Sequence, residues 1–260
     1  MNEIVEPKRV VITGASSGLG RALAVEYARQ GATLALIARR GDALKELAAS
    51  LPVRSHCYQV DVRDANALMA AGKDFVHRVG CPDIVIANAG VSAGTLTQHA
   101  EDARVFEEIL ATNVTGMMLT FQPFLEAMRS NKRGVLAGIA SVAGFRGLPG
   151  ASAYCASKSA AITYLESLRL ELQASGIKVV TVCPGYIDTP LTEVNTYRMP
   201  FMMKAQTAAP RIVDAISRTK RFYVLPWQMA IAGWFLRRLP RNLYDFLFAL
   251  APRKPRRTTS

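Results

Sequence analysis

Short runs of apolar, often β-branched residues alternate with longer amphipathic segments along the chain. The short runs predict strands at residues 9–13, 33–37, 54–60, 83–87, 134–140, 177–182 and 222–225. The segments between them repeat apolar positions at helical spacing and predict helices at residues 19–30, 42–50, 66–79, 103–128 and 153–174. Several strand runs, such as VVIT and IVIA, are apolar throughout, which is typical of parallel strands covered by helices on both faces. The pattern therefore predicts an α/β fold, a doubly wound, Rossmann-like parallel sheet of about seven strands.

Two segments depart from this alternation. Residues 186–207 are rich in Met, Thr and Pro, and they fit a lid or substrate loop better than a passive linker. After Leu225, two apolar and aromatic segments, 229–239 and 243–251, lead into a basic stretch. We therefore expect a catalytic domain at residues 1–225 and an amphipathic, helical C-terminal extension at residues 226–260.

The composition is that of a folded protein. With 260 residues, 50% of them hydrophobic and 20% charged, the chain is neither intrinsically disordered, collagen-like nor a disulfide-stapled miniprotein. Its four cysteines are scattered and it has only three histidines, so no metal site is expected. The N-terminal residues lack the apolar run of a signal peptide. We expect a protein of the cytoplasm with reduced cysteines.

The net charge of +12 is concentrated near the end of the chain. Residues 218–260 contain ten Lys or Arg and one acid, which leaves a charge of +3 on residues 1–217. The same region holds both tryptophans and an apolar helical face made by Leu243, Phe246, Leu247 and Leu250. Such an extension could lie peripherally on an anionic membrane surface, or pack on the body or across a dimer. The longest uncharged run is too short to span a bilayer, and the apolar content argues against nucleic-acid binding.

A glycine-rich turn, TGASSGLG at residues 13–20, follows the first predicted strand and opens a helix. Glycines let the backbone turn tightly and approach a pyrophosphate, while the helix presents its positive end to that charge. The strand before the turn and the helix after it are the context that this motif requires. We expect its dinucleotide contacts to be Gly14, Ser16, Ser17, Gly18, Leu19 and Gly20.

The turn and five later motifs resemble the short-chain dehydrogenase/reductase family in order and spacing, from residue 8 to about residue 189. The later motifs are Asn88-Ala89-Gly90, Asn113, Ser141, Tyr154-Cys155-Ala156-Ser157-Lys158 and Pro184-Gly185. The resemblance implies hydride transfer between a nicotinamide and a carbonyl or secondary alcohol, in a homodimer or homotetramer. It also implies that Asn88, Ala89 and Gly90 flank the adenosine ribose, that Asp61 and Val62 recognise adenine, and that Pro184, Gly185, Ile187 and Thr189 lie beside the nicotinamide.

The end of the second strand bears on which nicotinamide cofactor is used. A site for NAD(H) usually places an acid about 20 residues after the glycine-rich turn, whereas this chain has Ala38 there, followed by Arg39 and Arg40. A carboxylate would repel a 2′-phosphate, and a guanidinium can bind it with two parallel hydrogen bonds. We therefore predict NADP(H) rather than NAD(H), with Arg39 as the main contact and Arg40 and Ser16 in support.

Four residues are expected to carry the proton chemistry. Tyr154 and Lys158 are four apart in a predicted helix, so both lie on one face, and the ammonium should lower the phenol's pKa toward neutrality. Ser141 ends a strand and could donate to a substrate oxygen as negative charge develops. The resemblance adds that Lys158 bonds the nicotinamide ribose and that Asn113 holds a water in the proton relay. We take Asn113, Ser141, Tyr154 and Lys158 as the catalytic set.

The substrate pocket is predicted from segments near the catalytic residues. Residues 92–96, 142–148, 186 and 191–203 should line its pocket, with Ser141, Val142, Phe145, Tyr154 and Tyr186 as contacts. An apolar, Met-rich lid suits a small lipophilic carbonyl or alcohol, although Met is as often packing material. Two alternatives are a 3-oxoacyl thioester reductase of fatty acid synthesis and a non-catalytic, NADP(H)-sensing interaction protein. The extended C-terminus and apolar lid disfavour the first, and the intact catalytic set disfavours the second.

Overall fold

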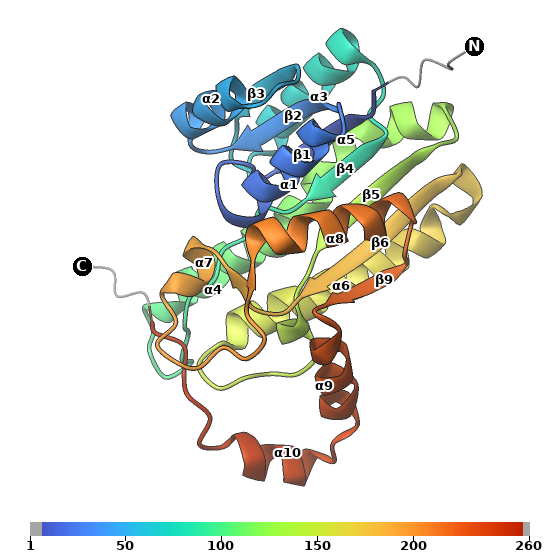
Figure 1. Cartoon of the computed structure of the whole chain (residues 1–260). Helices are drawn as coiled ribbons and strands as arrows, with labels where there is room; N and C mark the ends of the chain where they lie inside the picture. Colours follow the sequence, from blue (N-terminus) through green and yellow to red (C-terminus); the bar gives the residue numbers. More distant parts are fainter. Residues whose placement is uncertain (1–6, 257–260) are drawn as a thin grey trace.

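The predicted doubly wound α/β fold is confirmed by a computed structural model, which describes residues 7–256. Seven parallel strands form one sheet in the order β3-β2-β1-β4-β5-β6-β9 (Figure 1). These strands are β1 (Arg9–Thr13), β2 (Thr33–Ala38), β3 (Ser55–Gln59), β4 (Ile84–Ala87), β5 (Gly134–Ile139), β6 (Ile177–Pro184) and β9 (Phe222–Leu225). The strand order reverses between β1 and β4. In such sheets ligands bind outside the carboxyl ends of the strands, at that reversal.

Helices cover both faces of the sheet and explain why its strands are apolar throughout. One layer contains α1 (Gly18–Arg29), α2 (Gly41–Ser50) and α8 (Ala205–Ser217), and the other contains α3 (Ala65–Val79), α5 (Gly116–Ser130) and α6 (Ser152–Glu171). Successive residues of β1 serve different cores, because Val10 and Ile12 pack toward the first layer and Val11 toward the second. Each layer thus buries its own set of strand side chains.

The helix predicted at residues 103–128 is interrupted in the structure. It consists of α4 (Asp102–Leu110), a π-helical turn η1 (Ala111–Thr115) and α5. Such turns insert an extra residue into an α-helix and often occur at functional sites. Here the turn carries Asn113, one of the predicted catalytic residues.

Residues 186–207 form a structured excursion between β6 and α8. The segment contains β7 (Ile187–Asp188), α7 (Pro190–Glu193) and β8 (Met203–Lys204), and β7 pairs in parallel with β8. Its first part lies at the carboxyl end of β6. The excursion therefore begins at the edge of the sheet where a ligand site is expected.

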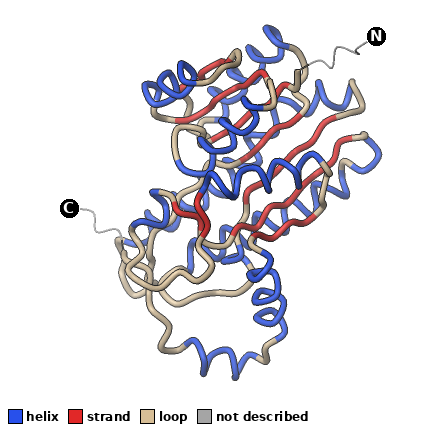
Figure 2. The backbone as a smooth tube through the Cα atoms, in the orientation of Figure 1, coloured by secondary structure: helices blue, strands red, loops and turns tan. Residues whose placement is uncertain are grey.

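The C-terminal arm, residues 226–256, extends away from β9 and then folds back onto the loop after β4. The predicted helices appear as α9 (Trp227–Arg238), which packs beside β9, and α10 (Arg241–Phe248), which loops connect to the body on both sides (Figure 2). The following residues 252–256, here called the strap, lie against the loop after β4, where the Gly94 amide donates to the Pro255 carbonyl at 2.9 Å. Arg257, the last basic residue of the predicted extension, lies outside the described residues, as do residues 1–6. Across residues 7–256, no helix combines the length and hydropathy needed to cross a membrane.

Candidate active site

A cavity of about 430 Å³ opens at the carboxyl ends of the central strands. Every residue predicted to contact the dinucleotide lines it: Gly14, Ser16, Ser17, Gly18, Leu19, Gly20, Arg39, Arg40, Asp61, Val62, Asn88, Ala89, Gly90, Tyr154, Lys158, Pro184, Gly185, Ile187 and Thr189. The lining also includes Leu191 and Thr192, from the segment expected to form the substrate pocket, and residues that sequence reasoning missed, namely Ala38, Val60, Val91, Thr112, Ile139, Ala140 and Pro190. Most of these are chain neighbours of predicted residues at strand ends, so adjacency was the available signal.

The glycine-rich turn forms a cradle that side chains would fill. Gly14 and Gly18 have φ values of +68° and +53°, in the left-handed region that favours glycine. A Cβ on Gly14 would lie 2.8 Å from the Cα of Ala89, and one on Gly20 would meet the Gly14 carbonyl. Ser17 caps α1 without a side-chain hydrogen bond, which leaves the first amides of the helix available to an anion. The cradle fits the pyrophosphate of a dinucleotide.

Basic groups gather at the end of the cavity near β2 and β3. Arg40 donates from Nη2 to Ser16, at 3.3 Å to Oγ and 3.4 Å to the carbonyl oxygen, and Arg39 is exposed beside it. The Asp61 carboxylate accepts from Arg63 Nε at 3.1 Å and Nη2 at 2.6 Å. This side-chain hydrogen bonding holds the pKa of Asp61 below its usual range. The carboxylate expected to meet adenine is therefore engaged by a neighbouring arginine.

Tyr154 and Lys158 both point from α6 into the catalytic end of the cavity. The Lys158 ammonium is buried, donates to the Ile139 carbonyl at 2.8 Å and lies 5.8 Å from the centre of the Tyr154 ring. Ser141, which follows β5, accepts from the Ala143 amide at 3.1 Å. The phenol, the ammonium and this hydroxyl therefore converge at one end of the cavity.

Burial decides the proton affinities of the catalytic pair. It raises the pKa of Tyr154 to about 12, against a smaller lowering by the Ser141 hydrogen bond, and it lowers the pKa of Lys158 to about 8. The expected lowering of the phenol's pKa is therefore not found in the ligand-free protein, where the pKa of Tyr154 is raised. A poorly solvated pocket disfavours phenolate and ammonium alike, and burial is the largest cause of both shifts.

Asn113 connects the loop after β4 to the catalytic helix. Its Oδ1 accepts from the Val91 amide at 2.8 Å, and its Nδ2 donates to the Val91 carbonyl and to Ser157 Oγ, each at 3.0 Å. Ser157 in turn donates to the Tyr154 carbonyl at 2.8 Å. The Asn113 side chain is fully buried and absent from the cavity lining, and its hydrogen bonds tie the loop after β4 to α6. Its predicted role in holding a relay water stays a prediction. Sequence reasoning missed Ser157, although it lies within the Tyr-x-x-x-Lys segment.

Three predicted substrate contacts are not brought to the cavity. Val142 begins a 3₁₀ turn beside it, and the Tyr186 ring packs edge-on against Tyr197 at 6.5 Å. Phe145 faces α9, where the Arg237 guanidinium lies 4.2 Å from its ring centre. Phe145 therefore packs against α9 in this structure, and its predicted contact with the substrate stays a prediction. Of the five predicted contacts, only the hydroxyl groups of Ser141 and Tyr154 line the cavity.

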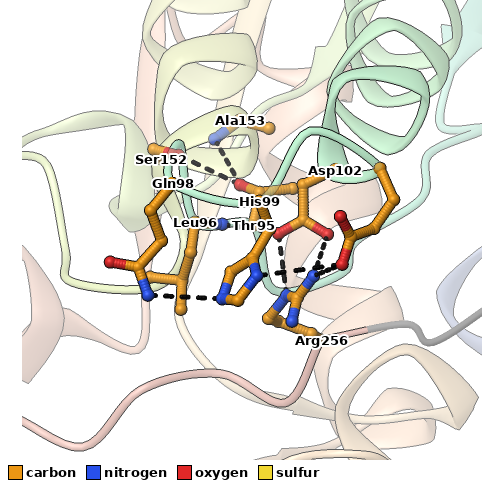
Figure 3. Close-up of polar contacts among 9 residues, drawn as sticks. Thr95, Leu96, Gln98, His99, Asp102, Ser152, Ala153 and Arg256 are labelled. Carbon is orange, nitrogen blue, oxygen red and sulfur yellow. Dashed lines mark hydrogen bonds and ion pairs between the residues drawn. The ribbon is translucent and has the colours of Figure 1, made fainter.

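The strap supplies neighbours that the sequence analysis did not foresee. Lys254 is 9% exposed, and its Nζ lies 5.7 Å from the centre of the Tyr154 ring. Two residues on, Arg256 pairs with Asp102 at 2.9 Å and with Glu101 at 2.7 Å (Figure 3). These contacts join segments about 154 residues apart in the chain, and no local pattern predicts such a pairing.

All four cysteines are free, and Cys155 and Cys183 are buried. Within residues 7–256, no three His, Cys, Asp or Glu side chains gather as a group that could hold a metal ion.

Comparison with known sequences gives consistent matches. The family model described as short chain dehydrogenase matches residues 8–199. An uncharacterized oxidoreductase of Myxococcus xanthus is 37% identical, over 92% of this chain and 95% of its own length. Dehydrogenase/reductase SDR family member 7B of Bos taurus is 32% identical over 99% and 85% of the two chains, and epidermal retinol dehydrogenase 2 of Homo sapiens is 34% identical over 84% and 73%.

Solved structures share the architecture. A short-chain type dehydrogenase/reductase from Mycobacterium marinum superposes with a TM-score of 0.77 at 28% identity, covering 84% of this chain and 93% of its own. An alcohol dehydrogenase from Thermococcus sibiricus, complexed with 5-hydroxy-NADP, gives a TM-score of 0.74 at 26% identity, with coverages of 85% and 95%.

Proposed function

The chain belongs to the short-chain dehydrogenase/reductase family, and from that premise we propose that it is an NADPH-dependent reductase of small lipophilic ketones, or oxidises the matching alcohols. It is an oxidoreductase that acts on alcohol or carbonyl groups, and the cofactor of its family is NAD(H) or NADP(H). The observation that carries the proposal is one cavity lined both by the glycine cradle and by Ser141, Tyr154 and Lys158.

The bound dinucleotide supplies or accepts the hydride, and the side chains handle the proton. In reduction, the Tyr154 phenol gives its proton to the carbonyl oxygen, while the Ser141 hydroxyl donates a hydrogen bond to the same oxygen. Lys158 stabilises the phenolate that remains, because its ammonium is held on the same helix face. In oxidation, the phenolate takes the proton from the alcohol.

The preference for NADP(H) rests on Arg39 and Arg40 and on the lack of an acid at Ala38. Arg40 already bonds Ser16, so that both could meet a 2′-phosphate, and the Thermococcus sibiricus neighbour was solved with an NADP derivative. Measuring dissociation constants for both reduced cofactors by fluorescence tests the preference. We expect the Arg39→Gln variant to weaken NADPH binding about 10- to 100-fold, because the main charged hydrogen-bond partner of the phosphate is lost, and to leave NADH binding unchanged.

The control for that experiment is Arg211→Gln. Arg211 is an exposed arginine of α8 outside the cavity lining, so the variant loses the same charge without touching the site. Tighter binding of NADH than of NADPH by the unaltered protein would refute the preference.

The lipophilic substrate is supported by the Met-rich excursion and by one relative that carries the name of a retinol dehydrogenase, since retinol is an apolar alcohol. We expect kcat/KM for methyl ketones to rise with chain length from 2-butanone to 2-undecanone. The Tyr154→Phe variant should bind NADPH normally and lose turnover. Unchanged function of this variant would favour the sensor alternative, and faster reduction of acetoacetyl-CoA than of every ketone would favour the thioester reductase.

We also propose that α9 and α10 contact an anionic membrane surface. Eight large apolar side chains of the arm are exposed, with Phe246 81% and Leu250 96% exposed: Trp227, Ile231, Trp234, Phe235, Leu243, Phe246, Leu247 and Leu250. Exposed basic residues, including Arg241 and Arg253, belong to the same arm. Apolar side chains beside arginines suit an anionic lipid surface. Dimerisation through the same face would instead place the arginines of two copies opposite one another, where they repel.

Liposome sedimentation tests the membrane contact. We expect binding to vesicles that contain phosphatidylserine, and loss of binding in the double variant Phe246→Ser/Leu250→Ser. The matched control is Leu170→Ser, which removes a leucine that is 62% exposed on α6. Equal sedimentation of both variants, or protection of the arm by dimer formation instead, would refute the membrane contact. The homodimer or homotetramer expected from the family stays a prediction.

A further inference from the structure

The ring of Tyr154 has an ammonium group from each of two distant segments close to it. Lys158, on the same helix, is 5.8 Å from the ring centre, and Lys254, on the strap, is 5.7 Å from it. Building on the proposed function, we propose that Lys254 is a positioning residue that stabilises the Tyr154 phenolate, so that the strap is part of the active site.

The strap is held in place by specific contacts. Arg256 donates to both oxygens of Asp102, at 2.9 and 3.0 Å, and to Glu101 at 2.7 Å (Figure 3). The Gly94 amide donates to the Pro255 carbonyl at 2.9 Å, and a Cβ on Gly94 would lie 2.6 Å from that oxygen. Arg256 therefore holds the strap in place on one side of Lys254. Gly94 has no side chain, so the strap backbone can pack directly against the loop after β4.

The Lys254 side chain is mostly buried and has no opposite charge beside it, while its ammonium retains some contact with solvent. It is 9% exposed and forms no hydrogen bond or ion pair with any residue from 7 to 256. Burial lowers the pKa of its ammonium. Burying an unpaired ammonium is unfavourable, and an anion formed next to it offsets that cost. A phenolate on Tyr154 would be such an anion.

The other groups around Tyr154 cannot replace this cation. The polar and titratable groups that face the phenol are Ser141, Cys155, Lys158, Tyr186, Tyr197 and Lys254. Hydroxyl groups, phenols and a buried thiol are neutral near pH 7, so the two lysines are the cations of this set. The Lys158 ammonium also donates a hydrogen bond to the Ile139 carbonyl at 2.8 Å. Burial raises the pKa of Tyr154 to about 12, so phenolate formation needs stabilisation, and these two lysines are the cations that lie near the ring.

The distance between Lys254 and the Tyr154 ring sets how far the Lys254 charge shifts the pKa of Tyr154. The 5.7 Å separation joins the Lys254 ammonium to the centre of the Tyr154 ring, over which a phenolate delocalises part of its charge. Unit charges at about that separation, in an environment of effective dielectric constant about 20, shift a pKa by about 1 to 2 units. Removing the Lys254 charge should therefore raise the pKa of Tyr154 by at least about one unit.

A spectroscopic titration tests this without any substrate. Tyrosinate absorbance near 295 nm is followed against pH with and without NADP⁺, and the same titration of a Tyr154→Phe counterpart is subtracted to isolate one phenol among the eight tyrosines. We expect Lys254→Met to raise the pKa of Tyr154 by about one unit and Lys254→Arg to leave it close to that of the unaltered protein. The matched control is Arg253→Met, which removes the same charge from an exposed neighbour on the strap.

Kinetics provide the second measurement, with the alcohol of the preferred ketone as substrate. Because oxidation needs the phenolate as base, the rising limb of kcat against pH should move about one unit upward in Lys254→Met. At pH values below the pKa of Tyr154, kcat of the variant should therefore be about tenfold lower, with little change in KM. Arg256→Met, which releases the strap, should shift the limb in the same direction.

An unchanged phenol pKa in Lys254→Met would overturn the inference, as would an equal loss of activity at every pH, which indicates a structural role. If the unaltered protein binds no NADPH or reduces no ketone, the proposed function fails. The titration without NADP⁺ still decides the role of Lys254 in that case.

Discussion

Replacing Asn113 with alanine tests whether the π-helical turn holds the catalytic helix in place. The substitution removes all three hydrogen bonds of the buried side chain, two to the Val91 backbone and one to Ser157. No group that faces the cavity is changed, because the Asn113 side chain does not reach it.

The expected loss can be worked out bond by bond. The two contacts with the partly buried Val91 backbone contribute about 1 kcal/mol each. The contact with Ser157 is fully buried, and leaving that hydroxyl with one partner fewer costs about 2 kcal/mol. We expect the free energy of unfolding to fall by about 4 kcal/mol.

Urea denaturation followed by circular dichroism measures this loss, with an unchanged slope showing that the unfolded state is the same. The control is Asn131→Ala, which removes an exposed bond of 2.7 Å to the Ala127 carbonyl and should cost about 0.5 kcal/mol. Hydrogen exchange at the Val91 amide should accelerate in Asn113→Ala alone. A loss below about 1 kcal/mol, with Val91 still protected, would refute the view that Asn113 ties the loop to the helix.

Two further predictions concern the cavity. Gly14→Ala places a Cβ 2.8 Å from the Cα of Ala89 at a φ of +68°, so NADPH binding should weaken at least about tenfold by fluorescence titration. Gly31→Ala, at a φ of +77° with open space around it, should leave binding unchanged; equal weakening would contradict the steric argument. Burial lowers the pKa of Lys158 from 10.5 to about 8, so between these values the unfolded chain binds more protons and the cofactor-free protein gains stability as pH rises. Lys158→Met should remove that gain, as measured by urea denaturation across this pH range, although it also removes the buried hydrogen bond to the Ile139 carbonyl. An unaltered pH dependence would speak against a buried charge.

The sheet could be predicted because its signal is local. Runs such as Val10–Val11–Ile12 are apolar at every position, and the structure sends alternate side chains to two separate cores. The cavity lining could be predicted for the same reason, since parallel strands end at a common edge and the motifs follow those ends.

What escaped prediction depends on contacts between distant segments. The placement of Phe145 against Arg237 required knowing where α9 packs, and the pairing of Arg256 with Asp102 joins distant parts of the chain. The pKa of Tyr154 was misjudged because burial is a property of the folded pocket and is not visible in a helix spacing. The positions of the catalytic residues could therefore be predicted from the sequence, whereas the burial and distant contacts that set their pKa values could not.

Because of the π-helical turn at Ala111–Thr115, the fold of this segment depends on the number of its residues more than on their identity. A π turn contains one residue more than the α-helical path would need, and each residue rotates an α-helix by about 100°. Deleting a single residue there would let α4 and α5 fuse into one regular helix, and the amide of Asn113 would swing away from Val91. Natural variants of this segment should accordingly differ by substitution, while one-codon insertions and deletions are eliminated.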